Sequence, residues 1–131
     1  MMHKAILYLL ISMARIHAWT PNTTLNSLLA SALPANLSNF TMAESYSDTQ
    51  MVIFGGSDGT KMLNNAYVFN LTAMIWVEIT SVGPSPRMNS CSIVHQGNFY
   101  LFGGQNATQS NSSSTSYSSE LWRLNLVNET W

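Results

Sequence analysis

The chain has 131 residues and a net charge of −1, and only 8% of its residues are charged, against about a quarter in a typical soluble domain. Its five basic residues form no cluster, which excludes the electrostatic footprint of a nucleic-acid-binding protein. The hydrophobic fraction of 46% is sufficient for the core of one small domain.

Residues 1–18 are predicted to be a cleaved signal peptide. Lys4 supplies a positive charge ahead of the apolar run Ala5–Ala14, and Ile16 and Ala18 occupy the positions that a signal peptidase recognises. The run is too short to cross a bilayer, which needs about 20 residues. A buried strand or helix is the alternative interpretation. Residues 19–39 are then expected to form an N-terminal segment or linker.

Seven Asn-x-Ser/Thr triplets also favour export, because N-linked glycosylation takes place in the secretory lumen on exposed segments. About three triplets are expected by chance from this composition, so loops rich in Ser and Thr are an alternative source of them. All seven fall where loops or turns are expected. The candidate glycosylation sites are Asn22, Asn36, Asn39, Asn70, Asn106, Asn111 and Asn128. The chain is therefore predicted to be secreted, or lumenal with any membrane anchor beyond residue 131.

Two short apolar runs, each followed by paired glycines, predict two equivalent strands. Met51–Phe54 precedes Gly55 and Gly56, and Phe99–Phe102 precedes Gly103 and Gly104. Such runs are typical of strands buried on both faces between stacked sheets. Paired glycines let the chain leave a strand through backbone angles that other residues rarely adopt.

The segments that follow the glycines align without a gap, residues 66–76 with residues 121–131. Tyr67 corresponds to Trp122, and Trp76 corresponds to Trp131. Each copy predicts a strand and then a turn, at Ala66–Phe69 and Asn70–Ala73 in the first copy and at Leu121–Leu124 and Asn125–Asn128 in the second. A strand led by tryptophan follows, which is Trp76–Thr80 in the first copy.

The second copy is longer by seven residues, and the difference lies within the polar run Gln105–Ser119. An insertion confined to a loop is the usual way in which repeats vary. Ser81–Pro86 is rich in Gly and Pro and predicts the connection between the two units. Ser90–His95 is expected to open the second unit, and residues 96–98 to turn it onto Phe99–Phe102 as a hairpin.

This ordered combination resembles the kelch repeat. The residues that carry the resemblance are the two glycine pairs, the aromatic pairs Tyr67/Trp122 and Trp76/Trp131, and Pro86-Arg87 at the start of the second unit. The resemblance covers residues 40–131. It departs from the family pattern at Ser90, where His is frequent, and in residues 39–50, which lack the Pro-Arg pair.

The resemblance implies an all-β fold, in which antiparallel four-stranded blades form a β-propeller. Residues 40–131 supply about two blades, so an incomplete propeller and a truncated chain are expected. The resemblance also implies that the tryptophans pack between blades, with stacking on sugar rings as the alternative. Arg87 is expected to hydrogen-bond loop carbonyls, with a ligand-facing cation as the alternative.

Residues that could carry catalysis are sparse. The single cysteine, Cys91, cannot form a disulfide within the chain and is expected to be a small thiol facing the core. His95 is the one histidine outside the predicted signal and is expected to lie at a strand end. The sequence thus predicts no catalytic residue, no metal site and no cofactor, and enzymatic activity is not the favoured interpretation.

The favoured function is that of a secreted or cell-surface glycoprotein, a kelch-repeat interaction module. Its loops, above all Gln105–Ser119, would recognise an unknown protein or glycan partner. One alternative is a fragment of a propeller enzyme of the copper-dependent galactose oxidase class, whose His and Tyr cluster this chain does not supply. The other is a truncated gene product without a function of its own.

Overall fold

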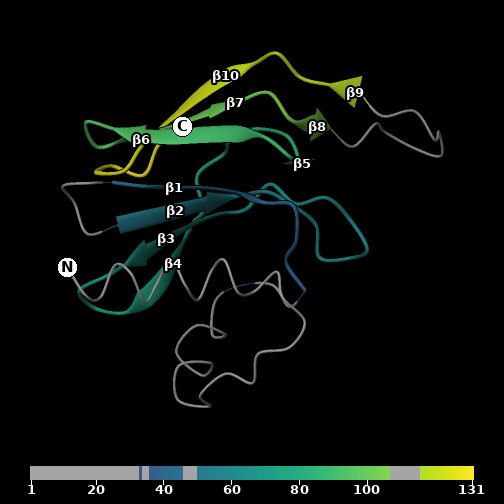
Figure 1. Ribbon diagram of the computed structural model, residues 1–131. Coiled ribbons are helices and arrows are strands. Elements are labelled where there is room, and N and C mark those ends of the chain that lie inside the picture. Colours follow the sequence, from purple (N-terminus) through teal and green to yellow (C-terminus); the bar gives the residue numbers. More distant parts are fainter. Residues whose placement is uncertain (1–32, 34–35, 46–49, 107–115) are drawn as a thin grey trace.

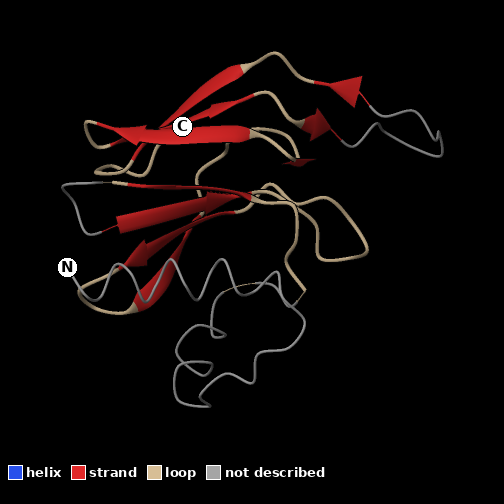
Figure 2. Cartoon of the chain, in the orientation of Figure 1, coloured by secondary structure: helices blue, strands red, loops and turns tan. Residues whose placement is uncertain are grey.

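The computed structural model describes residues 33, 36–45, 50–106 and 116–131, and the statements below concern these residues. They form strands and turns, with no helix among them (Figure 2). Two antiparallel sheets lie one above the other (Figure 1). The predicted all-β fold of antiparallel sheets is confirmed. The predicted signal peptide and the sites Asn22 and Asn111 lie outside the described residues.

The first sheet is a four-stranded antiparallel blade in the order β1-β2-β3-β4. Each strand pairs antiparallel with the next one along the chain, and β3 and β4 are joined by a short turn. The β4 strand begins at Ile75, one residue before the predicted start at Trp76. The bounds are β1 Thr41–Glu44, β2 Gln50–Phe54, β3 Ala66–Asn70 and β4 Ile75–Ile79.

The second sheet has three described strands in the order β10-β7-β6, which repeat the positions of β3, β2 and β1. These strands are β6 Cys91–His95, β7 Asn98–Phe102 and β10 Leu121–Asn125. A two-residue turn joins β6 to β7, with φ of 48° at Gln96 and 68° at Gly97. Two positive φ angles are what a type I′ hairpin turn requires. The predicted turn was therefore one residue too long.

A small third sheet extends from the end of the second blade and consists of three two-residue strands. They are β5 Arg87–Met88, β8 Gln105–Asn106 and β9 Ser116–Tyr117, in the order β5-β8-β9. In the first unit, single bridges of Ser57 with Ser38 and Met62 occupy the equivalent positions. The ends of the run predicted as a loop, Gln105–Ser119, thus contain strands, and the seven extra residues lie between β8 and β9.

Both units leave the third strand through the same kind of turn. The Asn70 side-chain oxygen accepts hydrogen bonds from the amides of Thr72 (2.9 Å) and Ala73 (2.8 Å). Asn125 accepts equivalent bonds from Val127 and Asn128. Each turn ends on a non-glycine residue in the left-handed region, Met74 and Glu129, both with φ of 57°.

The core lies between the two sheets. From the first sheet, Val52 and Phe54 contribute side chains that are 0% and 1% exposed. From the second, Phe99, Leu101 and Leu124 are all 0% exposed. Every residue of Met51–Phe54 is buried, so this strand is covered on both faces, as predicted.

The equivalent strand β7 is covered on one face alone. Phe99 and Leu101 point toward the first sheet, whereas Phe102 is 53% exposed on the other face. The prediction that Phe99–Phe102 is buried on both faces is therefore wrong. Burial of the second face needs a neighbouring sheet, and the described residues place none there.

Cys91 is exposed, so the prediction of a thiol facing the core is wrong. Alternate residues of a strand face opposite sides of its sheet. In β6, Ser92 and Val94 face the first sheet, and the Ser92 hydroxyl lies 2.6 Å from that of Thr41. Cys91 and Ile93 occupy the opposite face, which the described residues leave open.

Candidate functional site

The first glycine pair is the point at which the second unit docks onto the first. Gly55 and Gly56 have φ of 66° and 90°, and a Cβ on Gly55 would collide with the carbonyl oxygen of Arg87. The Gly56 amide donates a hydrogen bond to the same oxygen (2.9 Å), and the Arg87 amide donates to Leu63 O (3.0 Å). Glycine is required because the two backbones approach this closely.

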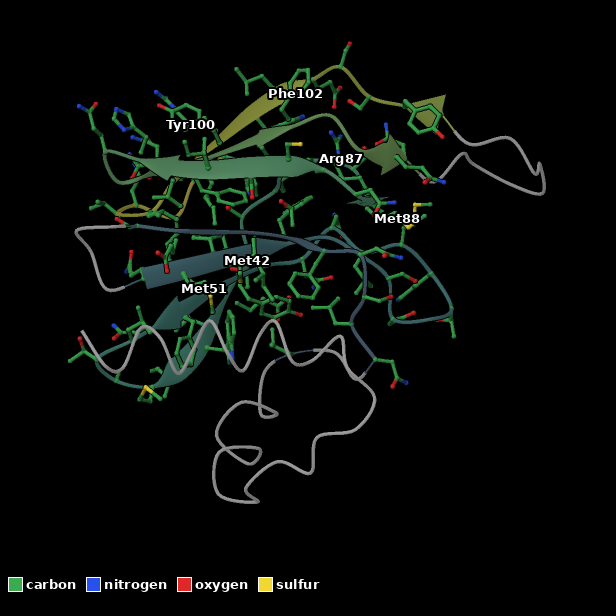
Figure 3. All side chains as sticks on the ribbon, viewed as in Figure 1. Met42, Met51, Arg87, Met88, Tyr100 and Phe102 are labelled. Atoms are coloured by element: carbon green, nitrogen blue, oxygen red, sulfur yellow. The ribbon has the colours of Figure 1, made fainter. Side chains whose placement is uncertain are left out.

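The Arg87 side chain is 0% exposed and holds the loops of the second unit together. Its guanidinium donates to the carbonyl oxygens of Ser85 (3.1 Å) and Gly103 (3.2 Å). It also forms an ion pair of 2.8 Å with the Glu120 carboxylate. A buried guanidinium with these partners has a structural role and is not presented to a ligand. Figure 3 shows Arg87 beside the small third sheet.

Glu120 joins this network at the surface, with 56% of its side chain exposed. It accepts hydrogen bonds from Trp122 Nε1 (3.0 Å) and the Ser118 hydroxyl (3.3 Å) in addition to the Arg87 guanidinium. The bond from Trp122, and then the bond from Arg87, hold the pKa of Glu120 below its ordinary value. These bonds stabilise the ionised carboxylate beside the Arg87 guanidinium.

Trp131 lies between the two blades. Its ring meets Phe54 of the first sheet at a centroid distance of 5.3 Å and Phe99 of the second at 6.1 Å, both edge-on. Gly83 of the connecting segment lies against this indole, and a Cβ there would overlap the ring. The sequence analysis did not predict this contact of Gly83 with Trp131. The position of Gly83 in the Gly/Pro-rich connection between the units could have indicated it.

The other two tryptophans of the repeat also pack on aromatic rings. Trp76 lies 4.8 Å from Phe69, on the face of the first sheet that points away from the second. Trp122 lies edge-on to Trp131 at 6.3 Å. These side chains are half-buried, and the observed contacts are those of packing rather than of an open stacking surface.

A pocket of about 350 Å³ opens beside the second glycine pair. One wall is the start of β6 with the end of β7, and the other is the base of the β8–β9 hairpin. Tyr117 stands at this pocket with 81% of its side chain exposed. The lining residues are Asn89, Cys91, Phe102, Gly103, Gly104, Gln105, Tyr117 and Ser118.

This lining can form hydrogen bonds and aromatic contacts. It offers amide and hydroxyl groups for hydrogen bonds, together with the rings of Phe102 and Tyr117. The lining contains no carboxylate, imidazole or cationic side chain. Within the described part of the chain, no group of three or more His, Cys, Asp and Glu residues is placed to hold a metal ion. Nor do the described residues include a helix long and apolar enough to span a membrane.

The described glycosylation candidates fall into two groups. Asn36, Asn39 and Asn128 are exposed. Asn70 and Asn106 are half-buried: Asn70 is the last residue of β3 and its side chain holds the following turn, whereas Asn106 belongs to strand β8, so the predicted placement in a loop or turn is wrong for Asn106. The Asn106 side-chain oxygen is buried and has no hydrogen-bond partner among the described residues. Glycosylation itself stays a prediction at all seven sites.

Known proteins resemble parts of this chain. Acyl-CoA-binding domain-containing protein 4 of Arabidopsis thaliana is 43% identical over 63 residues, which are 44% of this chain and 9% of that protein. Acyl-CoA-binding domain-containing protein 5 of the same plant is 40% identical over 63 residues, 44% of this chain and 10% of that protein. Rho GTPase-activating protein gacHH of Dictyostelium discoideum is 39% identical over 54 residues, 40% of this chain and 4% of that protein.

The similarity to these relatives thus covers a tenth or less of each of their lengths. A family match covers far more of the chain. The sequence model of the KLHDC2/KLHL20/DRC7 Kelch-repeats domain matches residues 13–131. Kelch repeats build protein-interaction modules in general. The repeated antiparallel sheets of this chain agree with a kelch-repeat match. The chain belongs to the KLHDC2/KLHL20/DRC7 Kelch-repeats family.

Proposed function

We propose that the chain is a secreted or cell-surface glycoprotein that recognises a protein or glycan through the β8–β9 end of its second blade. The observation that carries this proposal is the pocket beside the second glycine pair, bordered by a hairpin that is longer than its counterpart in the first unit. Recognition on a propeller scaffold resides in such loops, while the sheets supply rigidity.

The hairpin can vary without disturbing the blade. Tyr117 follows Gln105 by twelve positions, and Met62 follows Ser57 by five, yet each pair is bridged in the same antiparallel manner. The extra length therefore leaves the strand register intact. Tyr117, exposed at the base of the hairpin, supplies a ring that can stack on a sugar or pack against a protein side chain.

A loop exchange tests the recognition proposal. Residues 106–116 are replaced by Asp58–Lys61, which occupy the equivalent place between Ser57 and Met62. We expect this variant to fold and to lose binding at least tenfold in a screen of a glycan microarray and a panel of secreted proteins. A full-length variant with Asn106→Gln and Asn111→Gln is the matched control, because it removes both glycosylation triplets and keeps the loop.

The recognition proposal is overturned if no ligand binds the unaltered chain better than the loop-exchanged variant. It is also overturned if the double Gln variant loses binding to the same extent, since the attached sugar and not the loop would then make the contact.

Export and glycosylation have a separate test. Expressed with residues 1–18 in a eukaryotic host, the chain is expected in the medium and should lose mass on glycosidase treatment. Among the described sites, the exposed Asn36, Asn39 and Asn128 should carry more sugar than the half-buried Asn106. Retention of an unglycosylated chain inside the cell would overturn the proposal of secretion.

A further inference from the structure

Three polar side chains at the pocket beside the second glycine pair have no hydrogen-bond partner within the described part of the chain. They are the carboxamides of Asn89 and Gln105 and the phenol of Tyr117. Asn89 lies between β5 and β6, Gln105 belongs to β8, and Tyr117 belongs to β9. Three separate segments thus present free hydrogen-bonding groups to one cavity.

The other polar groups of the lining are already bonded. The Ser118 hydroxyl accepts from the Arg87 guanidinium (3.3 Å) and the Glu120 amide (3.1 Å), and it donates to the Glu120 carboxylate (3.3 Å). The Gly104 carbonyl oxygen accepts from the Ser118 amide (2.9 Å). The Gly103 carbonyl oxygen accepts from the Arg87 guanidinium (3.2 Å). A ligand would therefore gain its hydrogen bonds from the two carboxamides and the phenol.

The lining offers no charge to a ligand. It contains no carboxylate, ammonium, guanidinium or imidazole. Arg87 and Glu120, which bond to the Ser118 hydroxyl, neutralise one another at 2.8 Å, and the Arg87 side chain is 0% exposed. An ionised ligand would lose hydration here without gaining an opposite charge, which is unfavourable. The pocket therefore favours an uncharged ligand.

Two exposed aromatic rings complete the lining, Phe102 (53%) and Tyr117 (81%). Figure 3 shows Phe102 directed away from the first sheet. Aromatic rings pack on apolar faces, and a carboxamide both donates and accepts hydrogen bonds. A pyranose combines carbon-bound hydrogens on its faces with uncharged hydroxyls around its edge. The volume of about 350 Å³ is small for a ligand pocket, so it suits the end of a glycan.

We propose that this pocket binds an uncharged pyranose at the end of a glycan. The carboxamides of Asn89 and Gln105 bond its hydroxyls, and the ring of Tyr117 packs on its face. This inference rests on the proposed recognition function and narrows the ligand to a neutral sugar. A peptide fits less well, because its chain ends and its acidic or basic side chains would bring charges that the lining leaves unpaired.

Two sources could supply such a sugar. One is the glycan of a partner, and the other is the candidate glycan of this chain at Asn39. The Asn39 carbonyl oxygen accepts a hydrogen bond from the Asn89 amide (3.0 Å), which places this triplet next to the pocket. The experiment therefore compares the chain made in bacteria, which carries no N-linked sugar, with the chain secreted by a eukaryotic host.

The test titrates methyl glycosides of mannose, galactose, glucose and N-acetylglucosamine into the bacterial chain. The methyl glycoside of sialic acid is the charged probe. Proton–nitrogen correlation NMR follows the side-chain amide signals of Asn89 and Gln105. We expect at least one neutral glycoside to shift both signals to saturation, and we expect the sialoside to shift neither.

Matched substitutions assign the contact. Gln105→Leu removes the carboxamide and should weaken glycoside binding at least tenfold. Gln50→Leu makes the same change on β2, outside the lining, and should bind as the unaltered chain does. Tyr117→Phe should weaken binding less than Tyr117→Ala, because the ring remains. Circular dichroism checks that the variants fold, and the high exposure of Tyr117 makes its substitutions safe for the fold.

The sugar inference is overturned if no neutral glycoside shifts the two amide signals, or if the sialoside binds equally well. It is also overturned if Gln105→Leu binds as tightly as Gln50→Leu. If the secreted chain binds the glycoside more weakly and Asn39→Gln restores binding, the sugar belongs to the chain itself. Equal binding by the bacterial and secreted chains assigns it to a partner.

Failure of this inference can be told apart from failure of the recognition proposal. A protein ligand that is lost on loop exchange, but that neutral glycosides do not displace, would overturn the sugar inference and leave the recognition proposal standing. Glycoside binding that survives the loop exchange would do the reverse, because Gln105 and Tyr117 lie outside the exchanged residues.

Discussion

The indole of Trp131 meets the ring of Phe54 edge-on, at a centroid distance of 5.3 Å and an interplanar angle of 72°. The two residues belong to different blades and lie 77 positions apart in the sequence. Their contact fixes the second sheet over the first, and the glycine at position 83 makes room for it.

Truncation of this contact is expected to destabilise the chain. Trp131→Ala should lower the free energy of unfolding by about 2–4 kcal/mol, because the half-buried indole loses its packing on two aromatic rings. Trp131→Phe should cost less, and Val82→Ala, at a side chain that is 95% exposed, should cost little. Urea denaturation followed by circular dichroism measures all three. Equal losses for Trp131→Ala and Val82→Ala would contradict the inter-blade role.

Gly83→Ala tests the space beneath the indole. The added Cβ would overlap the Trp131 ring, so a loss of about 1–3 kcal/mol in stability is expected. In the Trp131→Ala background the same substitution should be nearly neutral, because the ring that it meets is gone. A double-mutant cycle from four urea curves measures this coupling. Additive losses would show that the cost of Gly83→Ala arises in the backbone and not at the ring.

Substitutions at Arg87 and at Glu120 should lower the stability of the chain by unequal amounts. Arg87→Ala removes one of the two donors to the buried Gly103 carbonyl, the Ser90 hydroxyl being the other, and takes the ion-pair partner from Glu120, so a loss of about 2–4 kcal/mol is expected. Arg87→Lys should recover only part of this, because an ammonium cannot reproduce the planar fork. Glu120→Gln should cost less than Arg87→Ala, since its side chain is 56% exposed and is hydrated on its own. Thermal unfolding of the three variants gives the order, and a reversed order would contradict the structure.

The turn at Asp58 predicts an acid-dependent contribution to stability. The Thr60 hydroxyl, and then the amides of Thr60 and Lys61, donate to this exposed carboxylate and lower its pKa from 3.8 to about 2. Because the folded pKa is the lower one, the turn is fully stabilised above pH 3.8, and this contribution is lost as the pH falls to about 2. Carbon-detected NMR titration of the Asp58 carboxyl measures the pKa directly. Thr60→Ala should raise it toward 3.8, and an unchanged value in that variant would count against the hydroxyl as the main cause.

Local signals predicted the parts of the fold that depend on one segment. Each glycine pair marks the end of a strand because the backbone there takes left-handed angles that follow from residue type. The turns after Asn70 and Asn125 were predicted to within a residue, since a side-chain oxygen that binds the following amides is also a local cause.

Features that depend on neighbours were missed. Which face of β7 is covered, and hence the exposure of Phe102 and Cys91, depends on whether another sheet lies beside it. Strands of two residues, such as β8 with Asn106, have no periodicity that a sequence pattern could reveal. The pocket could not be predicted from the sequence either, because it forms where β6 and β9 come together, and these strands are distant in the sequence.

The left-handed backbone angles of Met74 and Glu129 lower the stability of the chain below what glycine at these positions would allow. Each residue has a backbone conformation that costs an L-residue about 1 kcal/mol or more relative to glycine. Replacing each of the two residues with glycine would remove this cost and raise the free energy of unfolding. Because the two positions have the same backbone angles, the two increases would measure the same cost of a Cβ twice.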